Sequence, residues 1–413
     1  MERSKEVKIP VLLLSAYYFF IPMDKTQFDH LRAYGVVYNT LRGGLKVEWI
    51  LNYRGGSFLV EENKLTLQLL NTLGVTFEIL PEEKVVELKS KAENSNMEFV
   101  ILENPPKVAV YAPPYYEPWD DPVVMVLNYA QIPFTQIYDE EVLTGKLNEF
   151  DWVHLHHEDF TGQFGKFYAS YGNTDWYRTQ VTFKKETANK LGFTNVIELE
   201  RAVVREFSEF VKSGKYLFAM CSAPVTLNIA LASEGVDIHD VPFDGTPFDP
   251  ACNERLDYSK TLCFKDFRVI PQYYIYEHSD IDMTNEMAMR GEDSYFLLRE
   301  FSAKIDLIPC ILTQNHTKVI KDFLGQDTGF RRSKLKDNVV ILADLPGTEY
   351  VKYLYGEYGK GFFSFLGGHD PEDFQHFVGD PPTDIALHKN SPGYRLILNN
   401  LLLPSAQKKR LKT

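Results

Sequence analysis

Cysteine is scarce in this sequence, and its spacing excludes two common uses of the residue. The 413 residues contain only Cys221, Cys252, Cys263 and Cys310, and no two of them form a Cys-x-x-Cys motif. Zinc sites and disulfide frameworks are both recognised by clustered, regularly spaced cysteines. The sequence therefore indicates neither a cysteine zinc site nor a disulfide framework.

Basic residues are outnumbered, which argues against nucleic acid as a partner. The chain has 44 Lys and Arg against 57 Asp and Glu, a formal net charge of −13, and no stripe of basic residues. An acidic chain repels a phosphate backbone. The basic cluster at 408–412 ends the chain, and we interpret it as a solvated tail. We expect no nucleic-acid partner.

Long apolar runs are also missing at the N-terminus, where a membrane segment would be sought. The apolar run at 11–21 is shorter than the ~20 residues that a spanning helix needs, so we expect no integral membrane segment. Because basic residues precede 11–16, this segment resembles a short signal peptide that ends at Ala16. Continued to residue 21, it predicts a first strand instead. The location therefore stays open between the cytoplasm and export.

Glycine-rich turns occur, but they lack the spacing of nucleotide-binding loops. Arg54-Gly-Gly-Ser57 follows a predicted strand at 46–51, and such a turn can present N–H groups to an anion. It has the spacing of neither a Walker loop nor a dinucleotide fingerprint. We interpret it as an ordinary turn in which Arg54 is a candidate for binding substrate, and we expect no cofactor.

The stretch 215–235 predicts a buried strand that turns directly into a helix at Cys221. An apolar run ends at Met220, small residues stand at Ala219 and Ala223, and apolar residues then recur with helical spacing. This is the geometry of a nucleophile elbow, which points a side chain at a helix N-terminus and favours the thiolate. Cys221 is therefore a candidate nucleophile. The alternative is a small buried side chain that only packs.

Two further groups of polar residues follow predicted strands. One is His154-Leu-His156-His157-Glu158-Asp159, and the other is His369 with Glu372. Open parallel sheets bind ligands at the carboxyl ends of their strands. A cysteine nucleophile needs a base, and the base needs an orienting carboxylate, so His369 and Glu372 are candidates for these roles.

The first of these groups also has a second interpretation. Imidazole and carboxylate ligands suit zinc, iron or manganese. His154, His156, His157 and Glu158 are therefore candidate metal ligands.

The order of predicted elements indicates an α/β protein. Strand-like and helical segments alternate up to residue 235, and such alternation builds parallel sheets. The Asn-Pro-Pro segment at 104–106 is the best linker signal in the first half. We therefore divide the chain into an N-terminal α/β segment, 1–105, which either stands alone or extends the same sheet, and a domain at 106–413.

With these motifs in place, the chain resembles the class I glutamine amidotransferase-like superfamily. The elbow of the superfamily has the form Gly-x-Cys-x-Gly, and the corresponding residues here are Ala219-Met-Cys221-Ser-Ala223. The superfamily also has a His-Pro-Glu motif, which corresponds to His369-Asp-Pro-Glu372 with one residue inserted. The run 359–373 is similar to the trehalose-utilisation-protein branch, many of whose members lack the catalytic cysteine. The resemblance implies a flavodoxin-like, mostly parallel sheet with helices on both faces and a catalytic Cys221, His369 and Glu372.

Segments spread over nearly the whole chain resemble more closely a bacterial family labelled asparagine synthetase B. They lie at 21–27 with 52–58, at 156–163 and at 391–400. Members of that family often carry signal peptides. The synthetase proper uses a cysteine exposed after removal of Met1, and Glu2 stands at that position here. It also needs an ATP loop of the form Ser-Gly-Gly-x-Asp, which neither Arg42-Gly-Gly-Leu45 nor Arg54-Gly-Gly-Ser57 supplies. We therefore expect no ATP-dependent asparagine synthesis.

The leading hypothesis is an amidotransferase-like protein with Cys-dependent amide hydrolase chemistry on a small-molecule substrate. Cys221 attacks, His369 is the base that Glu372 orients, and His156, His157, Glu158, Asp159 and Arg54 contribute to substrate binding. One alternative is a non-catalytic module that binds a small molecule or carbohydrate through aromatic loops. Another is a metal-dependent enzyme that uses the cluster from His154 to Asp159. The oligomeric state stays open.

Overall fold

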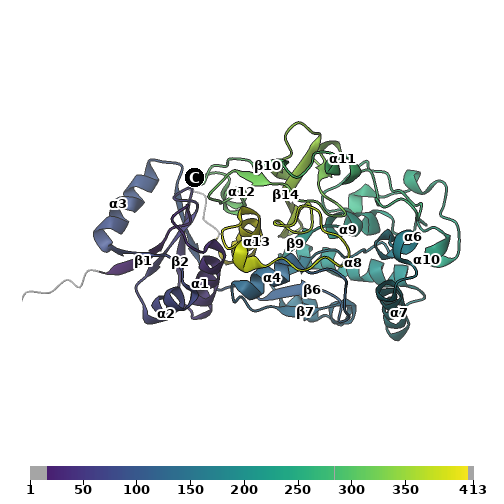
Figure 1. Cartoon of the computed structure of the whole chain (residues 1–413), viewed down its shortest axis with the longest axis horizontal. Helices are drawn as coiled ribbons and strands as arrows, with labels where there is room; N and C mark the ends of the chain where they lie inside the picture. Colours follow the sequence, from purple (N-terminus) through teal and green to yellow (C-terminus); the bar gives the residue numbers. More distant parts are fainter. Residues whose placement is uncertain (1–15, 283, 408–413) are drawn as a thin grey trace, which may run out of the picture.

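Two β-sheets and a helix packed between them form the framework of the computed structural model (Figure 1). The structure describes residues 16–282 and 284–407. Residues 11–15 of the segment considered as a signal peptide, and the basic tail at 408–412, lie outside the described residues.

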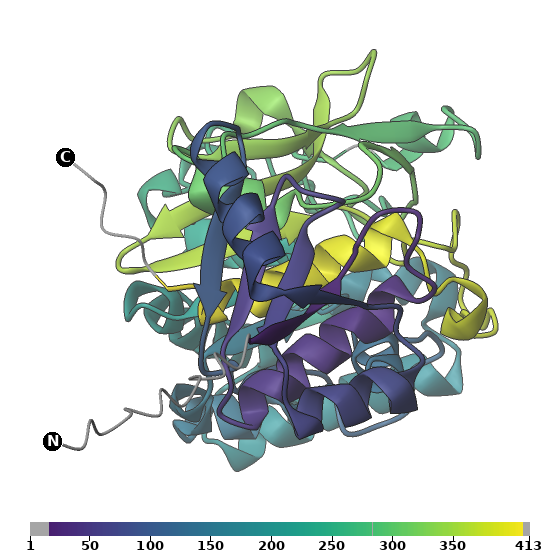
Figure 2. The same cartoon turned by 90° about the vertical axis from the view of Figure 1, so that its left-hand side faces the viewer.

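The N-terminal sheet is antiparallel and has the order β4-β1-β3-β2-β5. Side chains alternate across it, so that Phe19 and Trp49 pack with helix α1, while Phe20 and Ile50 pack with α3 on the opposite face (Figure 2). Its elements are β1 (Tyr17–Ile21), α1 (His30–Arg42), β2 (Val47–Leu51), β3 (Ser57–Glu61), α2 (Lys64–Leu73), β4 (Glu78–Pro81), α3 (Glu82–Glu93) and β5 (Glu98–Leu102).

The turn between β2 and β3 makes this pair of strands antiparallel. Arg54, Gly55 and Gly56 all have positive φ, at 45°, 78° and 83°, and the turn reverses the chain into a hairpin. A Cβ at Gly55 would lie 2.1 Å from the carbonyl oxygen of Met23. The close approach and the hairpin both depend on glycine, which the sequence analysis interpreted only as an ordinary turn.

The large sheet has the order β11-β10-β13-β14-β15-β9-β8-β6-β7, and β12 pairs with β14. Its strands are β6 (Val108–Tyr111), β7 (Thr135–Ile137), β8 (Trp152–Leu155), β9 (Tyr216–Met220), β10 (Tyr295–Leu298), β11 (Val319–Lys321), β12 (Phe330–Arg331), β13 (Val340–Asp344), β14 (Tyr350–Tyr358) and β15 (Gly361–Leu366). The helices of this part are α4 (Pro122–Tyr129), α5 (Asp139–Leu143), α6 (Tyr168–Tyr171), α7 (Asp175–Lys190), α8 (Val196–Lys212), α9 (Ala223–Ala232), α10 (Val241–Asp244), α11 (Thr284–Ala288), α12 (Leu307–Leu312) and α13 (Pro392–Leu402).

The prediction of a mostly parallel, flavodoxin-like sheet is wrong. Strands β7, β6, β8, β9 and β15 pair in parallel, but the pairings from β15 through β14, β13 and β10 to β11 are antiparallel, as is that of β12 with β14. The antiparallel half comes largely from 295–358. The Gly359-containing turn then folds β15 back on β14 as a hairpin, so one sheet contains both kinds of pairing.

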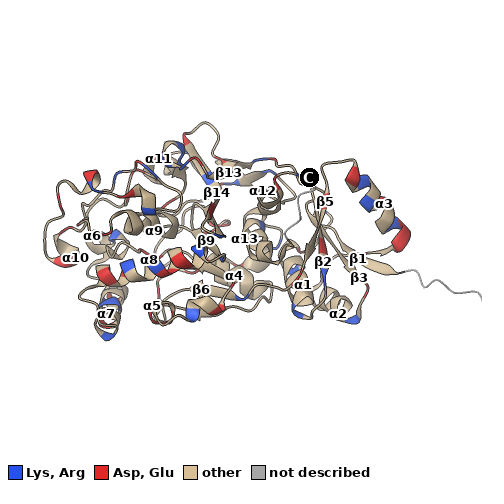
Figure 3. Ribbon diagram, turned by 180° about the vertical axis from the view of Figure 1, so that it is seen from behind, with Lys and Arg blue, Asp and Glu red and all other residues tan. Residues whose placement is uncertain are grey.

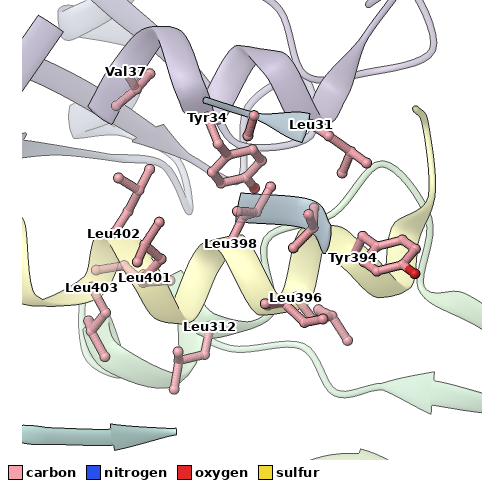
Figure 4. Packing of buried hydrophobic residues seen from close by; sticks show 14 of the residues in the cluster. Leu31, Tyr34, Val37, Leu312, Tyr394, Leu396, Leu398, Leu401, Leu402 and Leu403 are labelled. Carbon is pink, nitrogen blue, oxygen red and sulfur yellow. The ribbon is translucent and has the colours of Figure 1, made fainter. Parts of the chain in front are cut away.

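Helix α13 joins the two sheets. Leu398 and Tyr394 lie against Tyr34 and Leu31 of α1 on one side, and Leu312 of α12 lies on the other (Figure 4). Asn399 adds polar contacts inside this apolar layer: its carboxamide oxygen accepts a hydrogen bond from the Tyr34 hydroxyl at 2.5 Å, and its nitrogen donates to the Leu312 carbonyl at 3.1 Å. The helix thus fixes the N-terminal sheet against the large one.

The charge distribution agrees with the acidic composition. Lys and Arg are interspersed with Asp and Glu along elements such as α3 and α8, without a continuous basic face in this view (Figure 3). Among the helices in the described ranges, none is long and apolar enough to cross a membrane, which confirms that prediction for this part of the chain.

Replacement of Leu398 by Ala tests the joining role of α13. Leu398 is fully buried, and truncation of a buried leucine costs about 2–5 kcal/mol. We expect a loss of this size in urea unfolding followed by tryptophan fluorescence. Leu387, which is 78% exposed, is the matched control, and its replacement by Ala should change stability by less than ~0.5 kcal/mol. Equal effects of the two substitutions would contradict the packing.

Candidate functional site

The candidate residues lie at the carboxyl ends of adjacent parallel strands. Leu366 at the end of β15 is paired with Met220 at the end of β9, and Ala219 with Leu155 at the end of β8. The residues that follow these strands therefore share one edge of the sheet. The structure brings Cys221, the segment from His156 to Asp159 and His369 to that edge, together with the 113–121 loop after β6.

Three imidazoles form a buried chain of hydrogen bonds at this edge. Nδ1 of His154 lies 3.2 Å from the carbonyl oxygen of Phe218, and its Nε2 lies 3.2 Å from Nδ1 of His156. Nε2 of His156 lies 3.1 Å from Nδ1 of His369. The chain ends at Nε2 of His369, which is buried and has no hydrogen-bond partner among the described residues.

Two further side chains meet the open end of this chain. The ring of His376 stacks on that of His369, with centroids 4.4 Å apart, and Nε2 of His376 lies 3.7 Å from Oδ1 of Asp120. These two atoms are also buried, without a hydrogen-bond partner in the part of the chain that the structure describes. Asp120, His369 and His376 offer ligand atoms that all lie within 4.8 Å of one another.

Burial keeps the chain of imidazoles uncharged. It lowers the pKa of His154 to about 4, although the Asp121 carboxylate opposes the shift. Burial and the neighbouring imidazoles lower the pKa values of His156 and His369 well below the usual value. The backbone carbonyl of Asp120 faces His369 and opposes this only in part. Neutral imidazoles are the form that binds metal.

His157 has the opposite electrostatic environment. Its Nε2 lies 2.7 Å from Oε2 of Glu117. Burial alone would lower its pKa, but Glu117 and Glu158 raise the pKa to about 9, so His157 is an imidazolium in an ion pair at neutral pH. Burial raises the pKa of Glu158 to about 7, against the attraction of Lys184. This places a titratable carboxyl group beside the neutral imidazoles.

Cys221 has the backbone of an elbow but not the environment of a reactive thiolate. Its φ is 52°, a strained value for a residue with a side chain. Burial raises the pKa of the Cys221 thiol to about 12, although backbone N–H groups of Gln326 and Ser222 oppose the shift. Cys221 and His369 follow adjacent strands, yet the His369 ring contacts His156 and His376.

The other predicted site residues have partners of their own. Oε2 of Glu372 lies 2.9 Å from Nδ1 of His388, so the carboxylate proposed to orient His369 is held elsewhere. Arg54 pairs with Asp24 and with Glu78, on the N-terminal sheet. The structure does not bring Arg54 or Glu372 into the cluster of imidazoles.

Asp159 lies beside the cluster without joining it. Its carboxylate lies 3.4 Å from Nε2 of His278 and accepts hydrogen bonds from Thr161 and from the Gly165 N–H group. Burial would raise its pKa, but His278 and Thr161 hold the pKa of Asp159 well below its usual range.

Sequence reasoning missed several members of the cluster. Asp120 and Glu117 lie in the aromatic loop after β6, and His376 follows His369 by seven residues in an irregular segment. A weak signal was present, because the Asp120-Asp121 pair also follows a predicted parallel strand. His376 had no comparable signal, since its place depends on how the 370–384 segment folds back over the 113–121 loop, where the Gly379 N–H group donates to the Pro118 carbonyl.

Comparisons with known proteins assign no family to this chain. No family model matches the chain, and no curated protein matches it. Two solved structures of cytoplasmic proteins are similar to this chain, one from Salmonella typhimurium and the other from its strain LT2. Their TM-scores are 0.34 and 0.36, and their sequence identities are 9% and 10%. Each match covers 73% of this chain and 100% of the other. At these TM-scores the likeness carries no argument about fold or function.

The rate at which Cys221 is alkylated tests its proposed role as a nucleophile. Because the thiolate is the reactive form and burial raises the pKa of Cys221 to about 12, fewer than about one thiol in a thousand is ionised at pH 8.5. We expect slow alkylation of native Cys221 by iodoacetamide, with mass spectrometry of peptides as the readout. The denatured protein, in which all four cysteines should react, is the control. Fast native alkylation that persists below pH 8.5 would contradict this and favour the cysteine hydrolase.

Proposed function

We propose that this protein is a metal-dependent enzyme that acts on a small-molecule substrate, with its divalent cation bound by Asp120, His369 and His376. The proposal rests on two observations. Asp120, His369 and His376 offer ligand atoms within 4.8 Å of one another, and Oδ1 of Asp120, Nε2 of His369 and Nε2 of His376 are buried without hydrogen-bond partners in the described ranges. Buried polar atoms are nearly always paired. A cation would satisfy all three at once.

The donor set and its spacing support this assignment. Two imidazoles and one carboxylate suit zinc, iron and manganese. Ligands about 2.1 Å from one tetrahedral ion lie about 3.4 Å apart, close to the 3.7 Å between Nε2 of His376 and Oδ1 of Asp120. Nδ1 of His376 lies 3.0 Å from Oδ2 of Asp373. A carboxylate that accepts the Nδ1–H group orients the ring and leaves Nε2 free for the metal.

Three protein ligands leave coordination positions open for water and substrate, which is typical of catalytic rather than structural sites. A bound divalent cation lowers the pKa of its water and polarises a substrate oxygen, so hydrolysis is the reaction class that we propose. His157 and Glu158, which belong to a neighbouring group with Glu117, are our candidates for proton transfer. The ring of His157 lies 6.0 Å from that of His369, and burial raises the pKa of Glu158 to about 7.

The Cys-dependent amide hydrolase and the amidotransferase-like relationship have less support. The strained φ of Cys221 and the nearby N–H groups favour them. The high pKa of the thiol and the pairing of Glu372 with His388 do not. A non-catalytic binding module would not explain why polar atoms of Asp120, His369 and His376 are buried without hydrogen-bond partners in the described ranges.

Metal content of the purified protein tests the proposal. We expect about one equivalent of a transition metal by mass spectrometry of the native protein after dialysis. The variant His376→Ala should lose at least tenfold in affinity for added Co²⁺, because one of three ligands is removed. His388→Ala, which removes a histidine that pairs with Glu372, should bind Co²⁺ like the wild type.

Two results would sink the assignment. One is wild-type protein that binds neither Zn²⁺ nor Co²⁺ nor Mn²⁺ in stoichiometric amount. The other is equal retention of metal by the His376→Ala and His388→Ala variants.

A further inference from the structure

Resting on the proposed cation site, we propose that His154 and His156 are positioning residues that keep Nε2 of His369 free of a proton. Neither would be a metal ligand. They would act through the hydrogen-bond chain that runs from the Phe218 carbonyl to His369. The chain would decide which nitrogen of His369 carries its single hydrogen.

The argument begins with the fixed end of the chain. A carbonyl oxygen can only accept a hydrogen bond, so the contact at 3.2 Å between the Phe218 oxygen and Nδ1 of His154 requires the hydrogen on Nδ1. A neutral imidazole has one N–H group, so Nε2 of His154 is then an acceptor. His156 must therefore donate from Nδ1, and its Nε2 must accept from Nδ1–H of His369.

Counting hydrogens shows where the chain must be incomplete. Three neutral rings supply three N–H groups, but the chain has four junctions, because the Asp120 carbonyl also faces His369. One junction must lack a hydrogen. The three junctions at 3.1–3.2 Å have hydrogen-bond lengths, whereas Nε2 of His369 has no partner of hydrogen-bond geometry among the described residues. The bare lone pair is therefore on Nε2 of His369, on the side of Asp120.

A nearby charge favours a hydrogen at the junction between His154 and His156. Oδ1 of Asp121 lies 3.8 Å from Nε2 of His154 and 3.9 Å from Nδ1 of His156. The carboxylate itself accepts hydrogen bonds from the N–H groups of Val123 and Val124 at the start of α4, so its position is fixed. The carboxylate is almost equidistant from the two nitrogens, so it favours a hydrogen at this junction without deciding which ring carries it. That choice comes from the Phe218 carbonyl.

The reversed chain would block the metal. If His156 carried its hydrogen on Nε2, it would donate to Nδ1 of His369, and the hydrogen of His369 would move to Nε2. That nitrogen could then bind no cation until it lost the hydrogen. Groups that fix the tautomer of a ligating histidine typically affect metal affinity by 10–100-fold, and His154 would do so from two rings away.

The first experiment measures the tautomers without any metal. Long-range ¹H–¹⁵N spectra of histidine-labelled, metal-free protein distinguish protonated from bare ring nitrogens, and the ten histidines can be assigned by substitution. We expect His154, His156 and His369 to carry their hydrogens on Nδ1. A hydrogen on Nε2 of His369 would overturn the inference. Because this readout needs no cation, it stands even if the proposed metal site fails.

The second experiment compares two substitutions of His154 by Co²⁺ titration. Phenylalanine suits this position, since the ring of His154 lies beside those of Trp152 and Phe218, with centroids 6.1 and 5.3 Å away, but it offers no acceptor to His156. His154→Phe should weaken Co²⁺ binding by about 10–100-fold. His154→Gln keeps an N–H donor for the Phe218 carbonyl and an oxygen acceptor for His156, and it should restore binding to within about threefold of the wild type.

The pattern of the two variants separates the roles. Loss of Co²⁺ binding in both, at unchanged melting temperature, would mean that His154 is itself a ligand and would overturn the inference. Wild-type binding in both would mean a packing role only and would overturn it as well. If wild-type protein binds no metal, the proposed function fails, but the tautomer spectra of His154→Phe still decide the positioning role. The expected result in that variant is a hydrogen moved to Nε2 of His369.

Discussion

The parallel pairing of β8, β9 and β15 is the constraint on which the candidate site depends. It places His156 and His369, 213 residues apart in sequence, so that their ring nitrogens lie 3.1 Å apart. Because parallel strands end at the same edge, each strand adds its next residue to one surface. The segment that follows β11, in the antiparallel half of the sheet, also contacts this edge. There, the N–H group of His369 is held by the Leu324 carbonyl, so both halves of the sheet position this one residue.

Burial then decides the chemistry that the edge can perform. The same desolvation lowers the pKa values of His154 and His369 and raises that of Cys221. It therefore keeps these histidines neutral and the cysteine protonated at neutral pH. A thiolate in this position would need a cationic partner in contact with it. The imidazolium of the cluster, His157, is instead paired with Glu117.

The sequence predicted the local elements and some of the residues at this edge, but not the pairing of the sheet or the positions of Asp120 and His376. The strand that ends at Met220, the helix after Cys221 and the polar residues after β8 and β15 all follow from local patterns. The antiparallel pairing of β10, β13 and β14 depends on contacts between strands that no local pattern encodes. His376 was missed for the same reason: its segment has no periodicity, and its place is set by the loop from β6. Glu372 was predicted because it matched the His-Pro-Glu motif. The inserted Asp370 turns the chain away from that motif's arrangement, because its carboxylate accepts hydrogen bonds from the Tyr394 hydroxyl and the Glu372 N–H group.

The balance of buried charge is a further reason to expect a cation at this edge. Four carboxylates surround the imidazole chain, those of Glu117, Asp120, Asp121 and Glu158, against the two cations of His157 and Lys184. Lys184 is also shared with Asp139 and Glu200. Burial of excess negative charge is unfavourable, and proteins relieve it by protonation or by a bound cation. Burial raises the pKa values of Glu158 and Asp120, which is the first form of relief. Asp120, at 15% side-chain exposure, and His376, at 9%, lie on the side open to solvent, whereas His154 and His156 are sealed beneath them. A divalent ion that entered from that side would meet its ligands first and provide the second form of relief.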